Sequence, residues 1–190
     1  MRLLIGGTPT GTLKHISKQT YRHHCGMLTS WADGASPLHA VRIGAPWAMD
    51  NFAFVSFDAD RFRKSLQRFE SIPGCLFVVA PDVPRDAHAT ATLFDAWCDD
   101  IKRHGYPIAL AAQDGLENMP INWKAIDAIF VGGSDAFKYS QFVQELVFEA
   151  RMRHKWTHMG RVNSVPRWNY CQNALFDSVD GTGTVIERRR

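Results

Sequence analysis

Short apolar stretches rich in β-branched and aromatic residues alternate along the chain with segments of helical periodicity. This alternation is typical of parallel α/β folds, in which each buried strand is followed by a helix that covers the sheet. The stretches that we predict as strands are Leu3 to Ile5, Phe52 to Phe57, Leu76 to Ala80, Ile108 to Ala112, Ala128 to Val131, Thr157 to Gly160 and Leu175 to Val179. Nearly all of them end in polar or glycine residues.

Three segments between these strands carry the apolar stripe of an amphipathic helix. The stripes are Phe62, Leu66 and Phe69 in the first, Leu93, Phe94, Trp97 and Ile101 in the second, and Phe142, Leu146 and Ala150 in the third, which spans roughly 135–153. Ser134 is placed to cap the third helix, and Ser164 with Pro166 predicts the start of a further one.

Seven candidate strands in one repeating unit predict an α/β fold, a small (β/α)8 TIM-type barrel. Because 190 residues is below the usual size of this fold, we expect some helices to be short or missing, which would leave the barrel incomplete. An open doubly wound sheet is the alternative. The segment from Gly6 to Gly44 has no clear pattern, and we expect irregular structure there with one helix near Lys14 to His24.

Composition narrows the class of protein further. With 45% hydrophobic residues, the chain can bury the core of one compact domain, which we expect to span residues 1–190. The net charge of +3 permits a nucleic-acid partner without requiring one. The four cysteines form no Cys-x-x-Cys pair, so their spacing predicts neither a zinc site nor a disulfide framework. No apolar segment is long enough to span a bilayer, and we expect a cytoplasmic protein without a membrane partner.

Polar and glycine residues gather near the ends of the predicted strands. The carboxyl ends of parallel strands share one rim, where active sites collect, so these residues are the candidate site. They are Asp50 and Asn51 just before Phe52, Asp82 after the strand that ends at Ala80, Gln113 to Gly115, Gly132 to Ser134, Gly160 to Asn163, and Asp177 to Gly181.

Five short motifs follow one another at this rim. They are Ala-Pro-Asp at 80–82, Ala-Gln-Asp-Gly at 112–115, Phe-Val-Gly-Gly at 130–133, His-Met-Gly-Arg-Val-Asn at 158–163 and Phe-Asp-Ser-Val-Asp at 176–180. In this order they resemble motifs of the tRNA-guanine transglycosylase superfamily, and more closely those of its small phage-type, DNA-modifying relatives that handle 7-deazaguanines. The resemblance covers about Trp47 to Thr182. It implies a glycosyltransferase that exchanges one base for another.

The resemblance also implies two catalytic aspartates, with no metal and no cofactor. Asp180 corresponds to the nucleophile that forms a covalent glycosyl-enzyme, and Asp50 to the acid/base group. Retaining glycosidases divide the work between two carboxylates in a similar way. Asp177 and Asp180 are three residues apart, so in an extended segment they face opposite ways, and we assign the nucleophile to Asp180.

The chemistry of guanine predicts the rest of the pocket. Guanine presents N1–H and N2–H₂ donors beside an O6 acceptor, so its pocket needs a carboxylate and amide donors. We expect Asp82 to accept from the donors, and the Gln113 side chain with the Gly133 N–H to meet O6. The expected binding set is completed by Asn51, Gly132, Met159 and Gly160, with Trp47, Phe52 or Met159 as the stacking wall.

The sequence departs from the family pattern at two points. Asp50 is followed by Asn-Phe-Ala-Phe instead of Ser-Gly-Gly-Phe. The zinc-binding cysteine and histidine cluster of the tRNA enzymes lies beyond the nucleophile, and only ten residues follow Asp180 here. We therefore expect DNA in preference to tRNA as the polymer, and a free 7-deazaguanine-like base as the second substrate. Phosphate contacts are expected from Arg61, Arg63, Lys64 or the basic tract of residues 151–155.

Other interpretations of the same residues stay open. A hydrolase of the same fold, acting on nucleosides or DNA, is one alternative, and a non-catalytic barrel that binds nucleobases or nucleic acid is another. A carboxylate after a strand often caps a helix, although Asp86 is better placed than Asp82 to do so. Gly132 and Gly133 also suit a tight turn or a phosphate site. His154 and His158 lie four residues apart, but no Glu follows the first, and we expect no metal.

Overall fold

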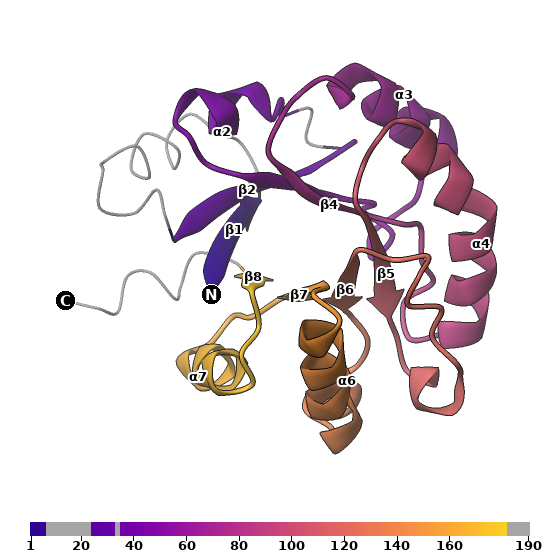
Figure 1. Cartoon of the computed structure of the whole chain (residues 1–190), viewed down its shortest axis with the longest axis vertical. Coiled ribbons are helices and arrows are strands. Elements are labelled where there is room, and N and C mark those ends of the chain that lie inside the picture. The colour runs from indigo at the N-terminus through magenta and orange to yellow at the C-terminus, as the bar shows by residue number, and fades with distance from the viewer. Residues whose placement is uncertain (7–23, 33–34, 182–190) are drawn as a thin grey trace.

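A computed structural model of the chain describes residues 1–6, 24–32 and 35–181 (Figure 1). Within these ranges, eight parallel strands close into a barrel in chain order, and the last strand pairs with the first. The strands are β1 (Arg2–Gly6), β2 (Cys25–Ser30), β3 (Trp47–Asp50), β4 (Cys75–Val79), β5 (Ile108–Ala112), β6 (Ala128–Val131), β7 (Trp156–Met159) and β8 (Ser178–Asp180). The predicted TIM-type barrel is therefore confirmed, and the open sheet is excluded.

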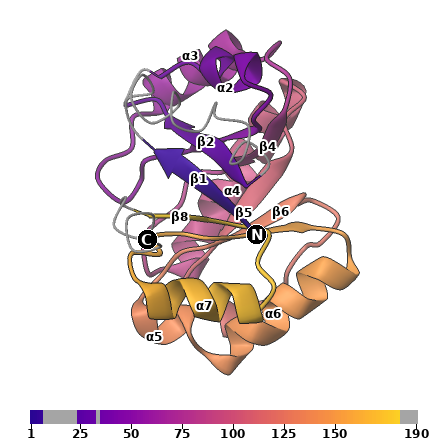
Figure 2. The ribbon, with the colours of Figure 1, turned by 90° about the vertical axis from the view of Figure 1, so that its left-hand side faces the viewer.

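The described helices cover the barrel unevenly. They are α2 (Leu38–Arg42), α3 (Ala59–Phe69), α4 (Ala87–Arg103), α5 (Asp135–Lys138), α6 (Gln141–Met152) and α7 (Val165–Asn173). The connection from β5 to β6 has only a 3₁₀ turn, Leu116–Asn118, so the expectation of short or missing helices is confirmed. In Figures 1 and 2, α6 and α7 lie on one side of the barrel, and α2 and α3 on the opposite side.

Helix starts follow the capping rules that the sequence suggested. Ser134 and Ser164 accept hydrogen bonds from the backbone N–H three residues on, as predicted. Asp86 caps α4 through the Ala89 N–H, which leaves Asp82 without a capping role. The single helix predicted over 135–153 is divided into α5 and α6, because the Ser140 side chain caps a second start at Val143 N–H.

Two apolar layers hold the fold together. A small cluster fills the barrel interior with inward-facing strand residues: Leu4, Leu28, Ala48, Phe77, Val79, Ala109, Ala111 and Ala128. A larger cluster consists of outward-facing strand residues and the helix residues that pack against them, such as Phe62 and Leu66 of α3. Because strand side chains alternate between the two faces, Asp50 follows Ala48 on the inner face and reaches the open end of the barrel.

One strand prediction was wrong. Phe52 to Phe57 is not a strand: Phe52 has a φ of 63°, and its carbonyl accepts from the N–H groups of Val55 and Ser56 in a tight turn. Phe54 is 61% exposed there, so an apolar run that suggested a strand lies on the surface. The real strand, β3, ends at Asp50, which places that carboxylate at the strand's end.

The strand β2 was not predicted, and it lies in the segment expected to be irregular. All six residues of β2 are buried, but few are β-branched, and Gly26 weakens the strand pattern. That glycine is required, because a Cβ there would lie 2.7 Å from Leu4 Cδ2 and 2.8 Å from the Pro46 carbonyl oxygen. The last strand begins at Ser178 and not at Leu175. The helix predicted near Lys14 to His24 lies outside the described residues, apart from His24.

Candidate active site

Three aspartates converge at the carboxyl-terminal end of the barrel. Asp50 and Asp180 are the last residues of β3 and β8, and Asp82 lies three residues beyond β4. Asp180 and Asp82 are both close enough to raise the pKa of Asp50 through their charge. The structure thus brings together the three carboxylates that the sequence singled out.

Asp50 is the carboxylate whose protonation is most changed by its surroundings. Burial raises its pKa to about 7, and the charges of Asp180 and Asp82 act in the same direction. The Phe52 N–H opposes this by donating to Asp50 Oδ1 at 3.1 Å. A carboxyl group with a pKa near neutrality can both give and take a proton at physiological pH.

Asp82 is held between two side-chain amides. Asn51, which is buried, donates from Nδ2 to Asp82 Oδ1 at 2.7 Å and to the Ala80 carbonyl oxygen at 2.6 Å. Gln113 donates from Nε2 to Asp82 Oδ2 at 2.6 Å. Burial raises the pKa of Asp82, and these two hydrogen bonds oppose the increase. The carboxylate is therefore fixed in orientation before any ligand arrives.

The Gln113 side chain makes one hydrogen bond through each of its polar atoms. Its Nε2 donates to Asp82, and its Oε1 accepts from the Arg85 N–H at 2.9 Å. Asn51 Oδ1 similarly accepts from the Ala53 N–H at 2.7 Å. Both residues lie at the rim, as expected, but they orient Asp82. The predicted contact between Gln113 and a base O6 stays a prediction, since one N–H of Nε2 already serves Asp82.

Gly132 and Gly133 let the loop after β6 approach its neighbours. A Cβ on Gly132 would lie 2.5 Å from Gln113 Nε2, and one on Gly133 would lie 2.6 Å from Asp114 Oδ2. Gly133 also has a φ of 77°, which other residues adopt only at a cost. Asp114 accepts from the Ser134 N–H at 2.8 Å and thereby ties the two loops together. Packing accounts for both glycines, as a tight turn would require.

Asp180 is surrounded by donors and positive charge. Its Oδ1 lies 2.9 Å from His158 Nε2 and accepts from the Arg161 N–H at 3.1 Å. Gly160 leaves room beside it, since a Cβ there would lie 3.5 Å from Asp180 Oδ1 and 3.0 Å from the Phe130 ring. Gly160 therefore lies beside Asp180, and its predicted contact with a substrate stays a prediction.

Arg161 belongs to this site, as the rim segment 160–163 predicted, and Lys138 and His158 join it although no role at the site was predicted for them. Lys138 is 2% exposed and donates from Nζ to the Gly160 carbonyl oxygen at 2.7 Å. Burial and the Arg161 charge lower the pKa of Lys138 to about 8, and the Asp180 charge opposes them. Arg161 reaches the Gly133 carbonyl oxygen at 3.0 Å and lies 4.1 Å from the centre of the exposed Phe54 ring.

Strand alternation was the signal that could have revealed His158, because it lies two residues before Gly160 on the inward face of β7. Lys138 gave no such signal, since a lysine in the first turns of a helix normally faces solvent.

Two residues expected to contact a ligand lie elsewhere. Met159 faces outward from β7 and is fully buried against the helices. Trp47 is also fully buried in the outer layer, and its Nε1 donates to the Pro73 carbonyl oxygen at 2.9 Å. Neither can stack on a base at the barrel mouth. Phe52 does lie at the rim, with its ring 5.6 Å from that of Trp31.

The opposite end of the barrel holds Asp177. Its Oδ2 accepts from the N–H and hydroxyl of Thr157, each at 2.9 Å, and its Oδ1 from Arg151 at 3.0 Å. Asp177 therefore lies just before β8 and Asp180 at its end, whereas their spacing predicted only that they face opposite ways. Arg151 binds Asp177 at the amino-terminal end of the barrel. The basic tract of residues 151–155 therefore does not lie at the carboxyl-terminal end, where the three aspartates converge.

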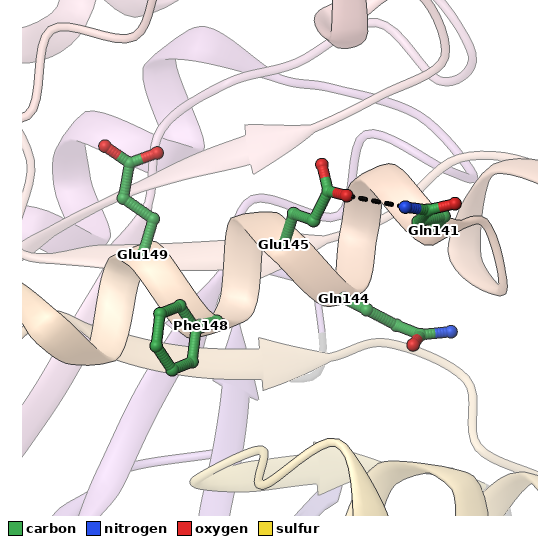
Figure 3. A pocket seen from close by; sticks show the side chains of 5 residues that line it. All are labelled: Gln141, Gln144, Glu145, Phe148 and Glu149. Carbon is green, nitrogen blue, oxygen red and sulfur yellow. Dashed lines mark hydrogen bonds between the residues drawn. The ribbon is translucent and has the colours of Figure 1, made fainter.

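The described residues also form a hollow apart from this site. An open hollow runs along α6, lined by Gln141, Gln144, Glu145, Phe148 and Glu149 (Figure 3). It contains none of the three convergent aspartates. No cluster of three or more metal-binding side chains occurs in the ranges that the structure describes. No helix in those ranges is long and apolar enough to cross a membrane.

Comparison with known proteins defines the fold. No protein-family profile and no curated protein sequence matches the chain. Among solved structures, an HpcH/HpaI aldolase from Desulfitobacterium hafniense DCB-2 matches 97% of this chain and 86% of its own, with a TM-score of 0.56 and 10% identity. A mandelate oxidase variant with a monooxide FMN adduct matches 93% of this chain and 63% of its own, with a TM-score of 0.56 and 13% identity. At such identities the likeness establishes a TIM-type barrel and no activity.

Proposed function

We propose that the protein is a base-exchange transglycosylase of the guanine-transglycosylase type, with Asp180 as nucleophile and Asp50 as acid/base group. The observation that carries this proposal is the contrast between two neighbouring carboxylates. Burial and two nearby carboxylates raise the pKa of Asp50 to about 7, whereas Asp180 lies among the donors His158 and Arg161. Two carboxylates in such different surroundings are typical of an acid and a nucleophile.

The proposed exchange has two displacements at C1′ of the nucleotide. In the first, an Asp180 oxygen forms a bond to C1′ while the bond from C1′ to the base nitrogen breaks. The electron pair of the broken bond stays with the base, which takes the proton of the Asp50 carboxyl group. In the second, the incoming base loses its proton to Asp50, and its nitrogen displaces Asp180 from C1′. Two inversions retain the configuration, and no proton is left over.

Asp82 is the proposed recognition group for the base. Its carboxylate is held by Asn51 and Gln113, yet each of its oxygens keeps a second lone pair for a ligand donor. Guanine and 7-deazaguanines offer adjacent N–H donors to such a group, whereas adenine does not. Fixing the carboxylate in advance lowers the cost of ordering it on binding.

DNA is the proposed polymer, and the structure restricts which cations can hold it. Arg61 lies 5.5 Å from the Trp31 ring near the mouth, and Arg85 and Arg161 belong to rim loops. Arg63, by contrast, packs on Trp97 and pairs with Asp100 away from the rim. We propose that Arg61, Arg85 and Arg161 bind phosphate, which would make binding weaker as salt increases.

A parallel exchange assay tests the proposal. Labelled guanine or 7-deazaguanine is incubated with single-stranded DNA, duplex DNA, tRNA and free nucleoside at one salt concentration. We expect incorporation into DNA, and faster into single strands, because a base in a duplex must first leave the stack. A preference for tRNA would contradict the choice of polymer. Release of guanine without incorporation would instead favour the hydrolase, in which water resolves the glycosyl-enzyme.

A further inference from the structure

A chain of polar side chains runs through the apolar interior of the barrel to Asp180. Trp156 and His158 lie on β7, and Ser178 and Asp180 lie on β8. Trp156 Nε1 donates to Ser178 Oγ at 2.8 Å, and Ser178 Oγ lies 2.8 Å from His158 Nδ1. His158 Nε2 lies 2.9 Å from Asp180 Oδ1.

For a neutral imidazole, donor and acceptor counting gives this chain of hydrogen bonds one direction. The indole N–H of Trp156 can only donate, so Ser178 Oγ accepts there. A carboxylate can only accept, so His158 Nε2 must carry the proton that it shares with Asp180. In a neutral imidazole Nδ1 then has no proton, and it accepts from the Ser178 hydroxyl. Every polar group is satisfied, with all donors pointing toward Asp180.

The surroundings of His158 are largely apolar. Its side chain is fully buried, its ring stacks on Phe130 with centroids 4.9 Å apart, and Phe77 lies 5.4 Å away on another side. The charged group in direct contact is Asp180, whose charge is also countered by Lys138.

The two oxygens of Asp180 are therefore not equivalent. Oδ1 takes the hydrogen bonds from His158 and from the Arg161 N–H, whereas no described residue donates to Oδ2. We propose that His158 is a positioning residue that holds Asp180 by Oδ1, as the neutral Nε2–H tautomer, and that Oδ2 is the oxygen that attacks C1′. The identity of the attacked atom rests on the proposed function, whereas the hydrogen-bonded chain does not.

Nitrogen-15 NMR of the 190-residue protein tests the hydrogen bonds from Trp156 to Asp180 directly. Proton couplings to the two ring nitrogens distinguish Nε2–H from Nδ1–H, and the signals of His158 are those lost in His158→Gln. We expect the Nε2–H tautomer near neutral pH, because the chain leaves Nδ1 as an acceptor. A proton on Nδ1, alone or together with one on Nε2, would overturn the assignment.

Kinetics with two substitutions test the positioning role. His158→Leu removes the donor to Asp180, and we expect kcat to fall about 10- to 100-fold with KM little changed, since a misplaced nucleophile affects the displacement and not ground-state binding. His158→Gln places an amide N–H near the position of Nε2, and we expect it to recover part of that loss. An unchanged kcat in His158→Leu would overturn the role, as would a Gln variant no better than Leu.

The control is Tyr106→Phe, which removes one buried hydrogen bond, from Tyr106 Oη to the Leu66 carbonyl oxygen at 2.7 Å, away from the site. It should destabilise the fold without lowering kcat. If the wild type exchanges no base in any substrate, the proposed function fails and the assignment of Oδ2 fails with it. The NMR measurement still decides the chain from Trp156 to Asp180 in that case.

Discussion

The two ends of the barrel use the same residue type in different ways. At the amino-terminal end, Asp177 and Asp127 accept from the backbone N–H groups of Thr157 and Ile108 on neighbouring strands. At the carboxyl-terminal end, Asp50, Asp82 and Asp180 lie close together, and burial raises the pKa of the first two. The carboxylates at the amino-terminal end stabilise strand pairing through hydrogen bonds. At the carboxyl-terminal end, the charges of Asp82 and Asp180 raise the pKa of Asp50. In TIM-type barrels generally, the carboxyl-terminal end carries the active site and the amino-terminal end serves stability.

The strongest test of this comparison uses Asp180, the last residue of β8. We expect Asp180→Asn to lower exchange by about 10⁴-fold or more and to abolish a trapped covalent adduct, because an amide is a poor nucleophile. Its melting temperature should stay within a few degrees of the wild type. Single-turnover assays and intact-protein mass spectrometry measure both effects. Turnover like that of the wild type would exclude Asp180 from the mechanism.

Asp50 predicts how activity and stability change with pH. Since its pKa is raised to about 7, the protonated acid is lost as pH rises through 7, and kcat/KM for base release should then fall about tenfold per unit. The folded state binds this proton more tightly than the unfolded chain does. The resulting stability is complete below about pH 4 and is lost as pH rises toward 7.

The control for that prediction is Asp50→Asn, which cannot titrate. We expect the melting temperature of the wild type, but not that of this variant, to fall between about pH 4 and 7. We also expect the residual kcat/KM of the variant not to decrease as pH rises through 7. A wild-type profile without a limb near neutrality would contradict the role of Asp50.

Asp82 tests recognition at the same end. We expect Asp82→Ala to weaken guanine binding by about 1.5–3 kcal/mol, or roughly 10- to 150-fold, because a charged hydrogen-bond partner is lost. Adenine binding should change much less. Calorimetric titration with both bases provides the comparison, and an equal loss for the two would mean that Asp82 only supports the rim.

At the opposite end, Asp177→Asn should affect stability and spare chemistry. Three hydrogen bonds from Thr157 and Arg151 depend on this carboxylate, and we expect a loss of about 1–3 kcal/mol in the free energy of unfolding. Urea denaturation measures the loss, and kcat of the folded fraction should equal that of the wild type. A large fall in kcat would show that the two ends are not separate.

The smallest effect comes from a matched pair of glycines. Gly105 and Gly133 have φ values of 76° and 77°, but only at Gly133 would a Cβ meet other atoms, at 2.6 Å from Asp114 Oδ2. Gly105→Ala should therefore cost about 1–2 kcal/mol of backbone strain alone, and Gly133→Ala about 1 kcal/mol more. Thermal unfolding compares the two. Equal losses would mean that Asp114 moves aside without cost.

The sequence by itself determined the class of fold and the place of the site. Runs such as Ile108 to Ala112 and Ala128 to Val131 match β5 and β6 because a fully buried strand needs a continuous apolar stretch. The polar residues that follow them identified the rim, because parallel strands all end on the same side. Spacing alone also separated Asp177 from Asp180.

Only the tertiary structure decided how these residues are used. Buried β2 gave no clear signal, since it is defined by neighbours such as Leu4 and Pro46 that pack against Gly26. Nothing local indicates that Gln113 serves Asp82, that Lys138 is buried close to Asp180, or that His158 Nε2 lies 2.9 Å from Asp180 Oδ1. These properties depend on side chains from strands far apart in the sequence, and hydrogen bonding and desolvation act through space, not along the chain.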